Sequence, residues 1–235
     1  MFDVLSLGNL YNSDYIGKQQ DSYIWSEKQN NPDALATVEF VFKNGHIGYM
    51  SSGLLQKMQS AYRIKGDGVL KLRKICDGIL FLDRDKDHYI IVLEVKSCFN
   101  EVKSNAIFQI PASYVKIKSI LNDFSNYKAE EYKELGLIIS YPYVEYAPTD
   151  AENNHIVIDN KLEMIGDRSE CIASKYVELL KNHKEAIFDG KDFEFDGLKG
   201  VKQELYFEKL KVKHYPVTNK CVAAEIDLDN VIKTL

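Results

Sequence analysis

The chain has 235 residues, of which 45% are hydrophobic and 28% charged, with only 5 Pro and 13 Gly. These values exclude a disordered or collagen-like chain, and the length fits one domain over residues 1–235. The net charge of -5 does not mark the whole molecule as a nucleic-acid-binding protein. No apolar run approaches the roughly 18 residues of a membrane-spanning helix, so we expect a soluble, cytoplasmic protein without a signal peptide.

The first part of the chain predicts an irregular lead-in, a hairpin and a helix. Residues 1–32 are mostly polar and show few periodic apolar positions. Over residues 36–50 apolar side chains alternate on both sides of Asn44-Gly45, a pair typical of a hairpin turn. A helix is expected over residues 52–62, and Gly66-Asp67-Gly68 ends it.

The middle of the chain predicts two strands, a helix and a third strand. Runs rich in β-forming residues cover 70–82 and 89–98, and the polar stretch 83–88 between them indicates a long antiparallel hairpin. A helix follows from about Asn105, with a proline in its first turns. The almost continuously apolar run 135–143 predicts a strand that is buried on both faces.

The last third predicts further strands around one more helix. We expect a short strand at 155–158, a helix over 169–188, and two strands over 205–217 and 221–228. No internal repeat or linker divides the chain. The predicted fold class is therefore α/β, with a mixed central sheet flanked by helices.

The predicted hairpin brings two acids together. If the hairpin is symmetric about Asp85 and Lys86, Asp77 lies directly opposite Glu94, and Cβ atoms so placed are about 4.5–5.5 Å apart. Lys96 is two residues beyond Glu94 and projects from the same face. Two opposed carboxylates repel unless a cation joins them, and such oxygen ligands suit Mg²⁺ or Mn²⁺.

This segment resembles the PD-(D/E)XK nuclease superfamily, the restriction-endonuclease-like proteins. The resemblance covers roughly residues 51–143 and rests on Ile75-Cys76-Asp77-Gly78 and on Glu94-Val95-Lys96, with 16 residues between the two acids. It implies a core made of a helix, an antiparallel hairpin, a helix and a strand. The flanking residues would then be N- and C-terminal elaborations of this core.

The resemblance also implies roles for individual residues in hydrolysis of phosphodiester bonds. Asp77, Glu94 and the Val95 carbonyl would hold Mg²⁺ or Mn²⁺, and Lys96 would orient a water or stabilise the transition state. Gln109 is the candidate for a glutamine that some branches place on the following helix. Ser113 departs from the branch that has tyrosine there. A third acid would come from Glu39, from Glu27 or from neither.

The implied substrate is DNA more than RNA, and the implied biology is bacterial or phage defence, with a homodimer or a partner protein. Six basic residues and a single acid lie between Lys57 and Lys74, which is either an ordinary solvated face or a polyanion site. Phosphate contacts are expected from basic residues around the hairpin and the following helix. These are Lys71, Arg73, Lys74, Lys103, Lys116 and Lys118.

Other interpretations of the same residues remain open. Acid-x-Lys recurs elsewhere in the chain, for example at Glu131-Tyr132-Lys133, so one alternative is that Glu94 and Lys96 form only a cross-strand salt bridge. A nuclease fold without activity would instead serve as a nucleic-acid-binding or assembly subunit, and an RNA-cutting effector is a third alternative. The 4 cysteines and 5 histidines lack ligand spacing, so we expect no zinc site or disulfide framework.

Overall fold

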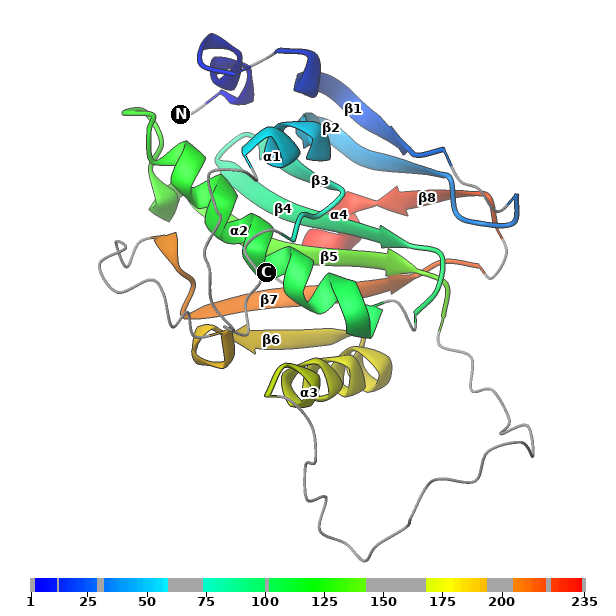
Figure 1. Ribbon diagram of the computed structural model, residues 1–235. Helices are drawn as coiled ribbons and strands as arrows, with labels where there is room; N and C mark the ends of the chain where they lie inside the picture. Colours follow the sequence, from blue (N-terminus) through cyan, green and yellow to red (C-terminus); the bar gives the residue numbers. More distant parts are fainter. Residues whose placement is uncertain are drawn as a thin grey trace, which may run out of the picture.

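The computed structural model describes residues 3–11, 13–28, 32–58, 74–99, 102–142, 168–193, 205–218 and 221–233. Eight strands form one mixed sheet in the order β1-β2-β3-β4-β5-β7-β6, and β8 pairs with β2 (Figure 1). The predicted α/β class is confirmed. The strand expected at 155–158 and most of the basic segment between Lys57 and Lys74 lie outside the described residues.

The elements have the following bounds. The strands are β1 (Ile16–Ser26), β2 (Thr37–Ser51), β3 (Gly78–Arg84), β4 (Asp87–Lys96), β5 (Tyr132–Ser140), β6 (Glu185–Asp189), β7 (Lys209–Pro216) and β8 (Ala223–Asp227). The α-helices are α1 (Ser52–Met58), α2 (Ile107–Leu121), α3 (Arg168–His183) and α4 (Leu228–Ile232). A π-helical turn, Val102–Ala106, leads directly into α2.

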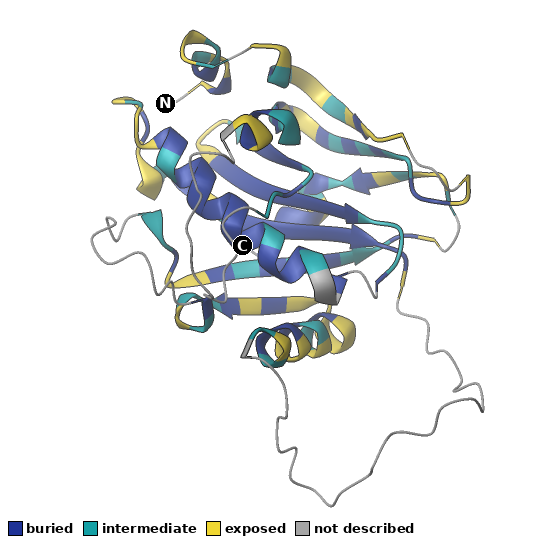
Figure 2. Cartoon of the chain, viewed as in Figure 1, coloured by how far each residue is buried: buried dark blue, intermediate teal, exposed yellow. Residues whose placement is uncertain are grey.

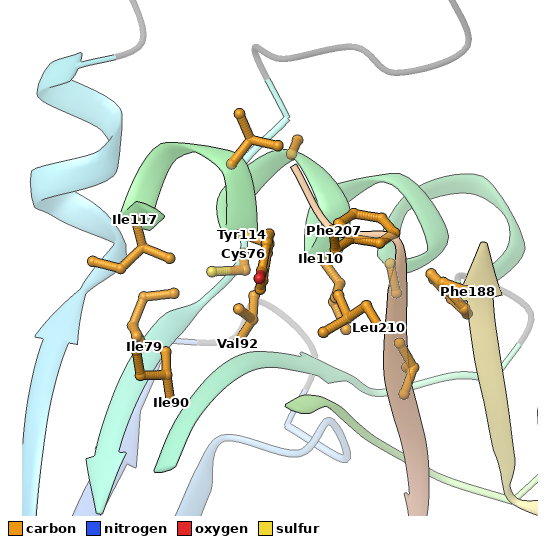
Figure 3. Packing of buried hydrophobic residues seen from close by; sticks show 14 of the residues in the cluster. Cys76, Ile79, Ile90, Val92, Ile110, Tyr114, Ile117, Phe188, Phe207 and Leu210 are labelled. Carbon is orange, nitrogen blue, oxygen red and sulfur yellow. The ribbon is translucent and has the colours of Figure 1, made fainter. Parts of the chain in front are cut away.

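Two apolar layers cover the sheet. Helices α1, α2 and α3 lie on one face of the sheet and α4 on the other (Figure 1). Their buried side chains join two separate apolar clusters. Helix α2 is buried at every residue except Gln109 and Ser119, whereas α3 exposes one side (Figure 2). Figure 3 shows α2 lying over the β3–β4 hairpin. Tyr114 and Ile117 lie above Cys76, Ile79 and Val92, whereas Ile110 lies beside Leu210.

The first two strands correct two expectations. Residues 1–32 include the long strand β1, and β2 is one continuous strand rather than a hairpin. The paired positions advance by two residues along β1, from Gln20 to Ser22, and by five along β2, from His46 to Val41. The extra residues of β2, which include Asn44-Gly45, form a bulge. Asn44 has φ 59°, the same left-handed conformation that a hairpin turn uses, and for that reason the local pattern misled the prediction.

The β3–β4 hairpin confirms the predicted register. Ile79 pairs with Val92 and Arg84 with Asp87, as symmetry about Asp85 and Lys86 requires. The turn is shorter than the polar stretch suggested, because the strands run up to these two residues and Asp85 adopts φ 53°. Strand β3 begins only at Gly78, later than predicted.

Strand β5 is central, as its apolar run predicted. It lies between β4 and β7 and is parallel to both. Helix α2 crosses this strand closely at Gly136, where an added Cβ would approach Ile110 Cγ2 at 2.7 Å and Val212 Cγ2 at 2.9 Å. The carboxyl ends of β4, β5 and β7 therefore meet at one edge of the sheet.

The helix predicted over 169–188 is shorter than expected. It ends at His183, and the residues after Lys184 form β6 on the outside of β7. Lys184 has φ 58°, and its N–H bonds to the Leu180 carbonyl at 3.0 Å, which closes the helix in a left-handed cap. The two predicted C-terminal strands are present as β7 and β8. Among the described residues, no helix is both long and apolar enough to cross a membrane.

Candidate functional site

Asp77 lies at the entrance to β3, immediately before the paired part of the strand. Its N–H bonds to the Leu93 carbonyl at 3.0 Å. Its Oδ2 accepts a hydrogen bond from the Val95 N–H at 2.7 Å. The carboxylate therefore accepts the hydrogen bond from β4 that a backbone carbonyl would accept if β3 continued.

Glu94 and Lys96 project from β4 toward the face that carries α2. Ile90 and Val92 precede them on that face, whereas Leu93 lies in the opposite core layer. The Lys96 ammonium forms an ion pair with Glu94 Oε1 and lies 3.8 Å from Asp77 Oδ2. The structure thus brings together the three groups that the hairpin arithmetic placed side by side.

Burial dominates the electrostatics of this trio. Glu94 has no exposed surface, and this burial, followed by the charge of Asp77, raises its pKa well above the usual value despite Lys96. Burial also raises the pKa of Asp77, against the opposing effects of Lys96 and the Val95 N–H. An isolated charge in such surroundings is costly, so the pair needs a cation or a proton.

The donor set fits a hard divalent cation. Within the described residues, neither Glu94 carboxylate oxygen has a well-formed hydrogen bond, although Oε1 is paired with the Lys96 charge. The N–H and C=O of one strand residue point to the same neighbour, so the Val95 carbonyl lies on the edge that faces Asp77. Two carboxylates and a carbonyl leave room for water and phosphate ligands, which Mg²⁺ prefers to keep.

A third acid lies near the pair, but it does not complete a metal cluster. The charge of Glu27 adds to the rise in the Asp77 pKa, so Glu27 is close enough to act on the site electrostatically. The hydrogen bond from the Leu35 N–H to Ser97 Oγ, 3.2 Å, brings the same end of the β1–β2 ribbon to the end of β4. The described part of the chain contains no group of three or more His, Cys, Asp or Glu side chains placed to hold a metal.

Gln109 contacts the backbone of the segment that leads into Asp77. Its Nε2 donates to the Ile75 carbonyl at 2.6 Å, and its Oε1 is buried without a hydrogen-bond partner among the described residues. The sequence correctly placed this glutamine on the helix after the hairpin. The structure gives it a contact with backbone rather than with either carboxylate.

The predicted phosphate contacts need correction. Lys116 and Lys118 are 0% and 4% exposed, because α2 is buried at nearly every residue. Lys116 donates to the Lys74 carbonyl, while Lys118 pairs with Glu134 at 2.6 Å and with the Tyr127 hydroxyl at 2.9 Å. Neither ammonium is available to a nucleic acid.

The remaining basic candidates are only partly described. Lys74 is half-buried, and its Nζ donates to Asn105 Oδ1 at 2.6 Å. Lys71, Arg73 and the side chain of Lys103 lie outside the described residues. A phosphate-binding surface therefore stays a prediction.

Sequence patterns gave no signal for a polar pair beside Lys96. Ser140, the partner of Lys96 in the β4–β5 register, lies 2.9 Å from Nε2 of His214 on β7. The Ser140 hydroxyl donates to the Tyr141 carbonyl, so the imidazole Nε2 must carry the proton in their shared bond. Because these residues are 74 apart, only the strand order brings them together.

The protein-family models, the curated proteins and the solved structures contain no match to this chain.

Proposed function

We propose that this protein is a Mg²⁺- or Mn²⁺-dependent endonuclease that hydrolyses phosphodiester bonds. The observation that carries the proposal is the buried Glu94, which lies beside Asp77 and has no well-formed hydrogen bond among the described residues. Burying one acid beside a second, half-buried acid costs free energy that plain packing does not recover. A recurring reason for such an arrangement is a functional site.

Each polar group of the site would have a distinct role in the reaction. Asp77, Glu94 and the Val95 carbonyl would hold the cation, which when bound neutralises phosphate charge and makes a nearby water more acidic. The Lys96 ammonium, 3.8 Å from Asp77 Oδ2, is placed to donate to that water or to a phosphate oxygen. The Val95 N–H fixes the Asp77 carboxylate in the orientation that this requires.

The substrate we propose is DNA rather than RNA, cut by a homodimer or with a partner protein, in cytoplasmic defence of a bacterium or phage. This part of the proposal rests on the resemblance of residues 75–78 and 94–96 to restriction-endonuclease-like proteins. The geometry of the site supports the chemistry of phosphodiester cleavage and does not distinguish the deoxyribose of DNA from the ribose of RNA.

One observation favours a second function. The Lys96 ammonium already lies close to both carboxylates, so the three side chains satisfy one another electrostatically without a metal. A chain with such a closed network would keep the fold and bind nucleic acid or assemble with another protein without cutting.

Cleavage assays separate these two functions. Plasmid, single-stranded DNA and RNA are incubated with the purified protein while Mg²⁺ or Mn²⁺ is titrated. We expect metal-dependent cleavage that falls at least about 100-fold in Glu94→Ala and Lys96→Ala, because each removes charge from the reacting centre.

A matched control uses a second acid-x-Lys sequence, at the start of β5. Glu131→Gln changes the acid of Glu131-Tyr132-Lys133, which lies away from the site, and should retain full cleavage. Circular dichroism spectra confirm that each variant is folded. Salt-sensitive binding without cleavage at any metal concentration would favour the second function instead.

A further inference from the structure

Three polar side chains of α2 hold the segment 74–76, which leads into Asp77. Each forms one hydrogen bond with the backbone of a different residue of that segment. The bonds run from Lys116 Nζ to the Lys74 carbonyl (2.6 Å), from Gln109 Nε2 to the Ile75 carbonyl (2.6 Å) and from the Cys76 N–H to Ser113 Oγ (2.8 Å). Positions 109, 113 and 116 are four and three apart, so they lie on one stripe of the helix.

The segment needs these contacts because it lies outside the sheet. Strand β3 begins at Gly78, so the backbone groups of residues 74–76 are not part of the β3–β4 ladder. Cys76 is nevertheless 1% exposed, and buried backbone donors and acceptors need partners. The side chains of α2 therefore form the backbone hydrogen bonds that a neighbouring strand forms elsewhere in the sheet.

Lys116 is the least expected member of this group. It has no exposed surface, and among the described residues no carboxylate lies within ion-pair distance of it. Burial lowers its pKa to about 8, an effect that the neighbouring Cys76 thiol partly opposes. A buried lysine without an acid partner is rare, so its bond to the Lys74 carbonyl is the feature that needs explaining.

We propose that Lys116 is a positioning residue of the site. With Ser113 and Gln109 it forms a clamp that fixes the backbone of residues 74–76 and thereby sets the Asp77 carboxylate beside Glu94. The effect of the clamp on catalysis rests on the proposed nuclease function. The clamp itself is independent of that function, so the two can fail separately.

Labelling of the Cys76 thiol tests the clamp directly. The thiol is buried, its pKa is raised to about 12, and a reagent reaches its thiolate only when the segment moves. Mass spectrometry of the Cys76 peptide gives the labelling rate in the wild type, in Lys116→Met and in Ser113→Ala. We expect Cys76 to label at least about tenfold faster in both variants.

Lys118→Met is the matched control. It removes a second buried lysine from the same helix, but that lysine contacts Glu134 and Tyr127 rather than residues 74–76. The rate of Cys76 labelling in Lys118→Met, compared at equal free energy of unfolding, should stay near that of the wild type. Unchanged Cys76 protection in both clamp variants would overturn the proposal, and so would equal acceleration in the control. Because Ser113→Ala removes only a hydroxyl, it keeps the test decisive if Lys116→Met does not fold.

Steady-state kinetics then test the catalytic consequence. Loss of an outer contact to a metal ligand typically reduces affinity or activity about 10- to 100-fold. We expect Lys116→Met to lower kcat by this factor with little change in KM, and Lys116→Arg, which keeps a donor, to recover part of it. If the wild type neither binds Mn²⁺ nor cuts, the proposed function fails while the Cys76 result still decides the clamp.

Discussion

Glu94 is the residue on which the proposed chemistry depends most. It continues the buried face of β4 after Ile90 and Val92, so an apolar side chain would suit its position. The sequence predicted its meeting with Asp77 because strand side chains alternate and symmetry about Asp85 and Lys86 sets the register that the structure has. Its meeting with Lys96 followed from the same alternation.

Residue type alone did not reveal which lysines reach solvent. In the sequence, Lys116 and Lys118 resemble exposed charges on a helix. Both are buried in the structure, because α2 packs in one apolar cluster with the sheet and with residues of α1 and α3. The clamp on residues 74–76 was equally hidden, because its bonds join side chains to backbone across more than 30 residues. Such contacts leave no periodic pattern in the sequence.

The buried imidazole of His214 predicts an acid-sensitive fold. Burial, with a smaller contribution from Lys184, lowers its pKa from 6.5 to about 4. Between these values the unfolded chain binds a proton that the folded protein does not, so the free energy of unfolding falls as the pH drops from 6.5 to 4. The full loss is about 3 kcal/mol, since each pKa unit corresponds to about 1.4 kcal/mol.

Urea denaturation at pH 7, 5.5 and 4 measures this contribution. His214→Asn lacks the titrating ring, so the stability difference between wild type and variant should shift by about 3 kcal/mol over the range. His183→Asn, at the exposed end of α3, is the control and should show no comparable shift. If the difference in free energy of unfolding between the wild type and His214→Asn stays constant with pH, the lowered pKa of His214 is contradicted.

At the scale of elements, the sequence predicted best where a strand or helix is buried on its expected face. Strand β5 was found because its apolar residues are nearly continuous, and helix α2 because its apolar residues recur at helical spacing. Strand β1 was missed because it is an edge strand with few buried side chains, held by pairing with β2 rather than by apolar burial. Strand β6 was absorbed into the preceding helix because the left-handed cap at Lys184 has no glycine to mark it.

The distance between α2 and the sheet depends on one glycine. A side chain at Gly136 would enter the space taken by Ile110 and Val212, whose methyl groups lie within 2.9 Å of the added Cβ. We expect Gly136→Val to lower the free energy of unfolding by about 1–3 kcal/mol, the usual cost of overpacking. Thermal and urea denaturation measure the loss.

Gly8→Ala provides the comparison for this change. Its added Cβ would meet only Ser13 Cβ at 3.7 Å, an ordinary contact, so no loss of stability is expected there. Equal stability of Gly136→Val and the wild type would show that α2 can move away from the sheet without cost. The close packing described for that helix would then be wrong.

At the scale of the whole molecule, the strand order gathers polar groups at one edge of the sheet. Glu94 and Lys96 end β4, Ser140 ends β5, and His214 lies near the end of β7, all in parallel strands. Ligands of α/β proteins commonly bind beyond the carboxyl ends of such strands. The sequence predicted the mixed sheet, but the order of its outer strands comes from long-range pairing that local patterns do not encode.

Binding of Mn²⁺ in a crystal tests the central claim most directly. The anomalous signal of the metal locates it without any assumption about substrate or activity. We expect a peak bonded to carboxylate oxygens of both Asp77 and Glu94 at about 2.0–2.3 Å, with the Lys96 ammonium displaced from between them. A crystal in which Lys96 stays paired with both acids and the metal binds elsewhere, or not at all, would contradict the proposed nuclease site.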